Sequence, residues 1–322
     1  MIESGDNDLS SQPAPMVSIG IAVYNAQGTL ADTIRSVFAQ TFTDWELILA
    51  DDSSTDDSLA IARSVADPRV RVLTDSVNRG QAFRHNQVTA QARGKYLARL
   101  DADDLMHPER LARQVAFLEA NPQVELIGTG AYTIDEANEP LGVRGLSPPD
   151  VRPAAVLKHS LFIHPSVMGR IEWFRRHPYD PAYVRSEDHE LWCRTCQNSV
   201  FAALPEPLVF YRESRSGNLS NYLRTAATDR KILRTYGPAT IGRWRTVLLV
   251  MRSHLKGALY AACTRLGLQG RLIARRNRAL AAAEIAQARA ALEGIRQTQV
   301  PGWGPAKNTN GERDYEVLGK PA

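Results

Sequence analysis

The sequence predicts an α/β protein built on a largely parallel sheet, followed by a helical extension. Three observations support this prediction. Short apolar runs bounded by turn residues alternate with helical patterns through the first half of the chain, which is typical of repeated β-α units. The length of 322 residues and the hydrophobic content of 43% allow a large buried core. Helical patterns dominate after the last apolar run.

The first half of the chain contains five apolar runs separated by helical patterns. Leu30, Ile34 and Val37 recur at helical spacing after the first run, and similar spacings follow the others. We expect strands over 17–23, 45–50, 70–73, 96–100 and 124–131, and helices over 27–40, 58–65, 81–92 and 108–119. The C-terminal ends of parallel strands meet at one edge of a sheet, where ligands bind.

The second half is less regular. The stretch 135–153 is rich in Gly and Pro and is expected to be a mobile loop. A helix over 187–197 follows, then two short strands over 200–203 and 208–211.

Cysteine usage and hydropathy exclude several classes of protein. Cys193, Cys196 and Cys263 are too few for a disulfide framework and favour a reducing cytoplasm, with the first two packing inside a helix. Residues 1–15 lack the basic start and apolar run of a signal peptide, so we expect a disordered tail. The most apolar stretch, 247–263, contains charged residues, so no membrane span is expected.

Acidic side chains follow the second and the fourth expected strand. Asp51 and Asp52 follow one, and Asp101, Asp103 and Asp104 follow the other. Residues two apart on an extended segment point the same way, so Asp101 and Asp103 share a side, and Asp104 faces elsewhere, toward a helix cap. Each cluster alone would suit a solvated turn. Two clusters at one sheet edge favour a divalent cation that bridges carboxylates to a nucleotide diphosphate.

Four ordered motifs resemble family 2 glycosyltransferases over residues 16–221. The motifs are VSIGIAVYN from Val17 to Asn25, DDSSTD from Asp51, LDADD from Leu100 and SED from Ser186 to Asp188. The ordered set is specific, although each motif alone is weak. The resemblance implies a GT-A fold, which is a Rossmann-like, mixed but mainly parallel sheet with a C-terminal helical extension. It also implies a nucleotide-sugar donor, usually a UDP-sugar, with Mg or Mn, and inversion at the anomeric carbon.

The resemblance assigns nucleotide contacts to the first two motifs. Tyr24 would pack on the base, and Asp52 would accept a hydrogen bond from it. Ala22 and Asn25 belong to the same binding segment, and Ala22 stands where the family commonly has Pro, which changes stiffness and not chemistry. From the residues alone, a buried core Tyr and a helix-capping Asp are the alternatives.

The third motif supplies the expected metal ligands. The resemblance places Asp101 near the ribose and makes Asp103 the metal ligand, with Asp101 as a second ligand. A basic residue of the stretch 78–86 would approach the nucleotide. Arg79 and Arg84 are the candidates, and the stretch reads Arg-His-Asn where the family usually has Ala-Arg-Asn. A surface Arg is the alternative for either.

Asp188 matches the catalytic base of the family. An inverting displacement needs one carboxylate to take the proton of the acceptor hydroxyl, although an acid that merely begins a helix favourably is the alternative. The sequence departs from the family at Ser214, where many relatives place a His, and Arg212 or Arg215 would stabilise the departing diphosphate instead.

Two further side chains are weaker candidates for the acceptor side. His164 would contact the acceptor or would be a satisfied core histidine. Trp192 would stack on a sugar ring, or would be an anchor buried by its helix.

The C-terminal region is strongly basic. Between residues 241 and 296, eleven Lys and Arg face Glu284 and Glu293 alone. An apolar stripe at helical spacing is flanked by cations, and its members are Leu248, Met251, Leu255, Leu259, Ala262 and Leu266, beside Arg252, Lys256 and Arg265. Peripheral contact with an anionic membrane and packing on the catalytic domain both fit this pattern. Nucleic-acid binding is not expected.

These inferences divide the chain into a disordered tail over 1–15, a GT-A domain over 16–221, a basic amphipathic helical extension over 222–296 and a flexible tail over 297–322. We expect a cytoplasmic hexosyltransferase at the inner face of the membrane. It would act on a glycan or lipid-linked acceptor in the synthesis of a cell-surface polysaccharide or similar glycan. The alternatives are a non-catalytic nucleotide-sugar-binding or scaffold protein, and a sugar nucleotidyltransferase.

Overall fold

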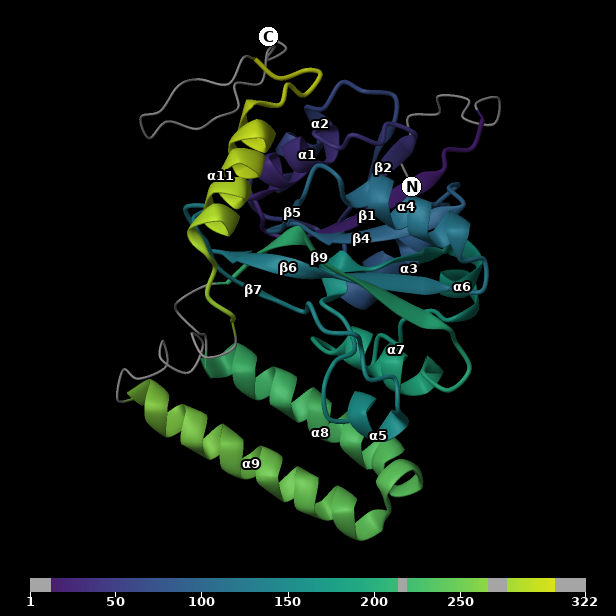
Figure 1. Cartoon of the computed structure of the whole chain (residues 1–322), viewed down its shortest axis with the longest axis vertical. Helices are drawn as coiled ribbons and strands as arrows, with labels where there is room; N and C mark the ends of the chain where they lie inside the picture. The colour runs from purple at the N-terminus through teal and green to yellow at the C-terminus, as the bar shows by residue number, and fades with distance from the viewer. Residues whose placement is uncertain (1–12, 214–218, 266–276, 305–322) are drawn as a thin grey trace.

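A mixed sheet covered by helices on both faces forms the body of the computed structural model, which describes residues 13–213, 219–265 and 277–304 (Figure 1). The strands are β1 (Val17–Val23), β2 (Trp45–Asp51), β3 (Val70–Thr74), β4 (Tyr96–Asp101), β5 (Leu105–Met106), β6 (Leu126–Ile134), β7 (Pro140–Arg144), β8 (Met168–Arg170) and β9 (Phe201–Arg212). The helices are α1 (Leu30–Phe38), α2 (Ser58–Arg63), α3 (Gln81–Gln91), α4 (Arg110–Ala120), α5 (Pro153–Val156), α6 (Ile171–Arg176), α7 (Glu187–Thr195), α8 (Leu219–Ile241), α9 (Arg243–Arg265) and α11 (Ala282–Gln297), with a short 3-10 turn over His164–Ser166.

The sheet runs in the order β3-β2-β1-β4-β8-β6-β9-β5, with β7 paired to β6. The first four strands are parallel, and β8 is antiparallel to both β4 and β6. In register, Val23 pairs with Asp51 and Ala22 with Asp101. The acid-bearing ends of β2 and β4 therefore meet on either side of the end of β1, as expected for parallel strands.

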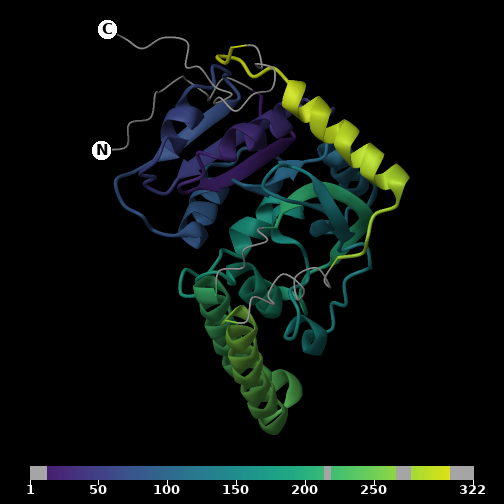
Figure 2. The same cartoon turned by 90° about the vertical axis from the view of Figure 1, so that its left-hand side faces the viewer.

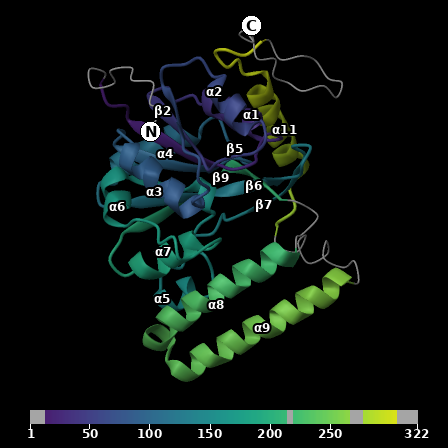
Figure 3. The ribbon, with the colours of Figure 1, turned by 180° about the vertical axis from the view of Figure 1, so that it is seen from behind.

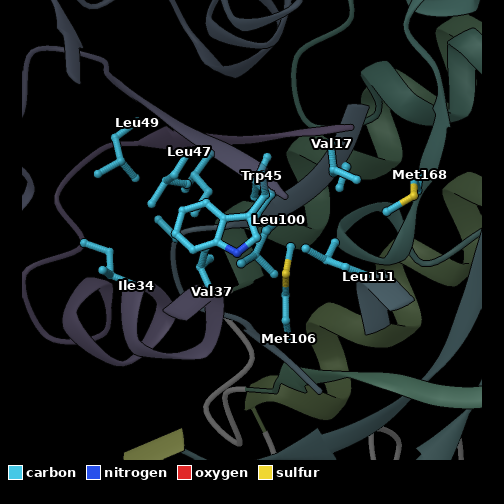
Figure 4. Packing of buried hydrophobic residues seen from close by; sticks show 14 of the residues in the cluster. Val17, Ile34, Val37, Trp45, Leu47, Leu49, Leu100, Met106, Leu111 and Met168 are labelled. Carbon is cyan, nitrogen blue, oxygen red and sulfur yellow. The ribbon is translucent and has the colours of Figure 1, made fainter. Parts of the chain in front are cut away.

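Alternate residues of the central strands enter two different cores. Leu47 and Leu49 of β2 pack with α1 and α4, while Ile48 and Ala50 pack with α3, α6 and α7. Figure 4 shows the first core, where Val37 of α1 lies near the Trp45 indole. Burial on both faces explains why this strand reads as a continuous apolar run.

The strands and helices expected in the first half are confirmed, with ends that shift by a few residues. The mobile loop expected over 135–153 is wrong in part, because β7 forms a hairpin with β6. At Gly142, glycine is needed for close packing and not for mobility. A Cβ there would lie 2.8 Å from the Cβ of Asn277 and 2.9 Å from the carbonyl oxygen of Arg278, so glycine permits the close approach of a later segment.

The two short strands expected over 200–203 and 208–211 form one strand, β9. Pro205 and Pro207 lie between the two expected strands, where the register between β6 and β9 shifts. Proline is tolerated at such irregularities because the ladder hydrogen bond is already lost.

The C-terminal helices separate into two groups. Helices α8 and α9 form an antiparallel pair that projects from the sheet domain (Figure 2), whereas α11 returns to pack along α1 (Figure 3). The flexible tail expected over 297–322 is wrong for its described part. Val300 and Trp303 enter the first core, and the Trp303 indole donates to Ser64 Oγ at 2.8 Å. Residues 305–322 and most of the tail expected over 1–15 lie outside the described residues.

Candidate functional site

Carboxylates from β4, from the turn that follows it and from α7 share one electrostatic environment. Burial and then the nearby carboxylates of Asp103, Glu187 and Asp188 raise the pKa of Asp101 to about 8, against the opposing effect of Arg99. A carboxyl with this shift lacks compensating positive charge in its ionised form. The fold thus brings together acids that lie far apart in the sequence.

Asp188 occupies the first turn of α7, as the sequence predicted for a helix start. Its carboxylate is half-buried and accepts a hydrogen bond from Ser160 Oγ at 3.3 Å. The preceding Glu187 is buried, and burial together with the Asp188 carboxylate raises its pKa to about 7. One acid at this helix start is therefore accessible and ordered, while its neighbour is held in the interior.

The Asp52 carboxylate is fully engaged by protein groups. It accepts hydrogen bonds from the backbone N–H groups of Arg79 and Gly80, at 2.8 and 2.9 Å, and from Arg84 Nε at 2.8 Å. Its predicted hydrogen bond with a nucleotide base remains a prediction. In this arrangement Asp52 shapes the loop that leads into α3, so it positions the backbone that borders the site.

The two Arg candidates are not equivalent. The Arg84 side chain is completely buried and pairs with Asp52 and with Asp75 at 2.9 Å. Direct contact of Arg84 with a nucleotide, one of the two sequence alternatives, is therefore corrected to a structural role. The Arg79 side chain is about half exposed and lies 3.5 Å from Asp75, which leaves Arg79 as the candidate.

The loops after β1 and β2 are tied together around Asn25. Its backbone N–H donates to Ser54 Oγ at 3.1 Å, and its Oδ1 accepts from the Thr55 N–H at 2.8 Å. Asn25 has a φ of 49°, a conformation that Asn adopts more readily than most residues. The neighbouring Tyr24 is 52% exposed and is not a core residue, while Ala22 is half-buried inside β1. The ring of Tyr24 is free to meet a ligand.

The acidic turn after β4 is held by Arg212. Its Nε donates to the carbonyl oxygen of Asp103 at 2.8 Å, and its backbone N–H donates to Asp104 Oδ1 at 2.8 Å. Its two terminal nitrogens bond Asp135 and Asn138. Each of the three guanidinium nitrogens thus donates to the protein, so the expected clamp on a diphosphate is replaced by a positioning role. The other candidate, Arg215, and the departure at Ser214 lie outside the described residues.

The predicted helix cap at Asp104 is wrong. Asp104 is 1% exposed, and α4 begins at Arg110 without a side-chain cap. Burial, together with Asp103 and Asp101, raises the pKa of Asp104 well above its usual value. Asp104 faces inward because the turn after β4 brings it against β9, where it accepts a hydrogen bond from the backbone N–H of Arg212. No local sequence pattern predicts this contact.

Two histidines that the sequence did not assign to this cluster lie against Asp101. Ligand atoms of His85, His164 and Asp101 lie within 4.8 Å of one another. His85 is buried, with Nδ1 3.2 Å from Arg99 Nη1, and His164 Nε2 lies 2.9 Å from the Tyr179 hydroxyl. The sequence feature that could have pointed to His85 is the Arg84-His85-Asn86 stretch, which stands where the family usually has Ala-Arg-Asn. A role in acceptor contact remains a prediction for His164.

The carboxylates fit a divalent cation better than the histidines do. Arg99 is a donor, so His85 Nδ1 accepts and Nε2 carries the proton, which occupies the lone pair that a metal needs. Burial and then Arg99 also lower the pKa of His85 well below its usual value. Asp101 and Asp103, in contrast, supply hard oxygen ligands to a cluster in which the pKa of Asp101 is raised despite the nearby Arg99.

The remaining candidates have structural surroundings. Trp192 is fully buried against Trp173, Phe162 and Phe201, so it is a buried anchor and not a sugar platform. Cys196 is buried and unpaired.

Comparisons with known proteins point to one family. The family model described as glycosyl transferase family 2 matches residues 18–185, a range that ends just before Asp188. The chain is 37% identical to EpsE of Bacillus subtilis, which is named as a glycosyltransferase, over 235 residues that cover 68% of this chain and 83% of that protein.

A relative and a solved structure carry more specific names. The chain is 27% identical to the Escherichia coli WfaP protein, named a UDP-Glc:alpha-D-GlcNAc-diphosphoundecaprenol beta-1,3-glucosyltransferase, covering 69% of this chain and 87% of that one. The fold resembles the mannosyltransferase PcManGT of Pyrobaculum calidifontis, solved with GDP-Man and Mn2+. That likeness has a TM-score of 0.55 at 16% identity and covers 88% of this chain and 86% of that chain.

Proposed function

Because the chain belongs to glycosyl transferase family 2 and is a glycosyltransferase, we propose that it moves a sugar, with inversion, from a nucleotide diphosphate to an acceptor hydroxyl. One observation carries the proposal. The carboxylates of Asp101, Asp103 and Asp188 gather at the C-terminal edge of the sheet, where burial and the charges of Asp103 and Asp188 raise the pKa of Asp101. Such a cluster suits a site that binds a cation and removes a proton.

The donor lies at the ends of β1 and β2 in this proposal. Tyr24 presents an exposed ring for the base, Asn25 orders the adjoining loop, and Asp52 holds the backbone N–H groups before α3. The exposed Arg79 approaches the phosphates. We propose a UDP-sugar, because the relative WfaP is named for UDP-Glc and is closer in sequence than PcManGT, which is named with GDP-Man.

Asp103 and Asp101 would hold Mg or Mn together with the donor. The metal, when bound, would neutralise charge on the leaving diphosphate. The protein residues around it have separate tasks. Arg212 fixes the Asp103 backbone, and buried Arg99 and Arg110 lie beneath the acids and offset part of their repulsion.

Asp188 acts as the base in this scheme. The acceptor oxygen attacks the anomeric carbon from the face opposite the diphosphate, and its proton passes to the Asp188 carboxylate. The bond from the anomeric carbon to the diphosphate oxygen breaks, and its electron pair leaves with the nucleotide. Ser160 holds the carboxylate from one side, which leaves the other oxygen for the acceptor.

We propose a lipid-linked glycan as acceptor, in polysaccharide synthesis, because WfaP is named for a diphosphoundecaprenol acceptor. We place the enzyme in the cytoplasm, at the inner face of the membrane. The unpaired state of Cys193, Cys196 and Cys263 is consistent with a reducing compartment.

A panel of UDP- and GDP-sugars, with and without Mn, tests the donor by thermal shift, because a bound donor stabilises the fold in proportion to its occupancy. The products formed with a bound donor then separate the functions. Transfer with release of nucleoside diphosphate supports the proposal. Formation of a nucleoside triphosphate and a sugar 1-phosphate when pyrophosphate is added to the donor would identify a nucleotidyltransferase, and donor binding without turnover would identify a scaffold protein.

A further inference from the structure

Helix α9 exposes a continuous apolar face. Its members recur every three or four residues, so they share one side of the helix. Their exposed fractions are 84% for Trp244, 65% for Leu248, 63% for Met251, 71% for Leu255 and 61% for Leu259. The alternative that the stripe packs on the catalytic domain is therefore wrong for its members Leu248, Met251, Leu255 and Leu259; Leu266 lies outside the described residues.

The opposite side of α9 is the one that packs. Thr246 is buried against Gly237 of α8, and the rings of Tyr222 and Tyr260 stack with centroids 4.0 Å apart. Helix α8 thus fixes the orientation of α9 and turns its apolar face away from the protein. Figures 1 and 2 show that the pair stands at one end of the molecule, clear of the sheet.

The α8-α9 pair carries a strong net positive charge. Residues 219–265 contain nine Lys and Arg and a single acid, Asp229. Arg252 and Lys256 follow Met251 and Leu255 directly and are exposed, so they flank the apolar face. A second copy of this surface would bring like charges together, whereas an anionic bilayer complements both the charge and the apolar face.

A cavity of about 310 Å³ lies behind this face. Arg252 and Lys256 line it from α9, and Lys158 lines it from the end of α5. Its floor includes His189, which lies 3.4 Å from Asp229 and immediately follows the proposed base Asp188. Apolar side chains complete the wall, including Leu157, Leu233 and Leu249. The cavity therefore combines cations with an apolar lining, between the exposed face and the catalytic cluster.

We propose that the α8-α9 pair is the acceptor platform of the enzyme. The apolar face of α9 seats in the surface of an anionic bilayer, and the cavity behind it binds the phosphate of a lipid-linked acceptor through Lys158, Arg252 and Lys256. The role of the cavity in binding the acceptor phosphate rests on the proposed function, whereas the membrane contact does not. Among the described residues, no helix is long and apolar enough to cross a membrane, so this contact is peripheral.

Flotation of the full-length protein with vesicles tests the membrane contact. Wild type is expected to float with vesicles that contain phosphatidylglycerol and not with pure phosphatidylcholine. The double variant Met251→Asp/Leu255→Asp should bind at least about tenfold more weakly, since it places charge in the apolar face. Val200→Asp, which changes an exposed apolar residue elsewhere, is the matched control and should bind as wild type does.

Two outcomes would overturn the membrane contact. One is equal flotation of wild type and the double variant. The other is a wild-type dimer that the double variant converts to a monomer in sedimentation, because a second copy would then cover the face. Neither depends on transfer activity, so failure here is distinct from failure of the proposed function.

Kinetics with two acceptors test the cavity. The variant Lys158→Ala is expected to raise the KM for a short-chain polyprenyl-diphosphate sugar about tenfold, through loss of a charge-assisted contact. The KM for the same sugar without phosphate, and flotation, should not change. An equal effect on both acceptors, or none on either, would overturn the cavity assignment. Inorganic phosphate at millimolar concentration should compete only with the phosphorylated acceptor; competition with neither acceptor would also overturn it.

Discussion

The Nε atom of Arg212 donates to the carbonyl oxygen of Asp103 at 2.8 Å and so joins the end of β9 to the acidic turn after β4. The same residue donates its backbone N–H to Asp104. These contacts hold the backbone of Asp103, the expected metal ligand, and the side chain of its neighbour Asp104. An arginine thereby orders the turn in a chain that has Ser214 where the family resemblance implied a histidine.

Replacement of Arg212 by Gln should weaken the binding of donor and metal together. The turn would lose a charge-assisted hydrogen bond, a loss of about 1 to 2 kcal/mol in the free energy of unfolding. We expect the Mn concentration at half-maximal thermal shift, measured with UDP present, to rise several-fold. Arg113→Gln, an exposed change on α4, is the control. An unchanged Mn titration would contradict the positioning role.

The variant Asp188→Asn should separate binding from chemistry. It keeps the size of the side chain but cannot take a proton, so kcat should fall by about 10² to 10⁴. The donor Kd should stay near that of wild type, because Asp188 lies on the acceptor side in the proposed scheme. Glu172→Gln, an exposed change on α6, controls for loss of an acid. Transfer at the wild-type rate would refute the assignment of Asp188.

Loss of the Arg84 side chain and loss of the Arg79 side chain should have different effects on stability and on donor binding. Arg84→Met leaves the buried Asp52 carboxylate without its partner and should lower the free energy of unfolding by about 3 kcal/mol. Arg79→Ala removes an exposed side chain, so it should leave stability within about 0.5 kcal/mol of wild type and weaken donor binding. Urea unfolding and donor titration distinguish the two. Equal destabilisation by both variants would contradict the different roles given to them.

Stability should fall at alkaline pH through His189. Burial alone would lower its pKa, but hydrogen bonds with Asp229, Cys193 and the Val156 carbonyl raise it to about 10 from 6.5. A folded-state pKa above the unfolded value stabilises the protein fully below pH 6.5, and this stabilisation is lost as pH rises toward 10.

The variant Asp229→Asn should therefore flatten the decline in stability across this range and lower stability at pH 6 by about 1 to 2 kcal/mol. Urea unfolding at several pH values measures both effects, with His159→Gln as the control for an exposed histidine. A wild-type curve as flat as that of Asp229→Asn would rule out the pair as the cause.

Local patterns were sufficient for most of the sheet and for the acids at its edge. Ile48 and Ala50 alternate with Leu47 and Leu49 along β2, and such an uninterrupted apolar run indicates a strand buried on both faces. Asp101 follows its strand directly, so its position at the carboxyl edge followed from the parallel order. Asp103 followed from its spacing two residues after Asp101, whereas Asp188 came from motif resemblance, and the structure brings both near Asp101.

Contacts between distant segments were beyond local patterns. Asp104 meets Arg212 across a separation of 108 residues, and Trp303 reaches Ser64 across 239. Pairing of this kind depends on which strands become neighbours, and the order in which β8, β6, β9 and β5 follow β4 has no signature within a single element. The same reason explains why the sequence left Arg79 and Arg84 equivalent.

The class of fold, the family, the acidic motifs and the basic, amphipathic character of α9 could all be inferred from local properties of the chain, namely periodicity and short motifs. Three other features became known from the three-dimensional arrangement: the covered face of α9, the identity of the buried arginine, and the histidines beside Asp101. These are questions of burial, and the burial of a side chain is set by the segments that fold against it.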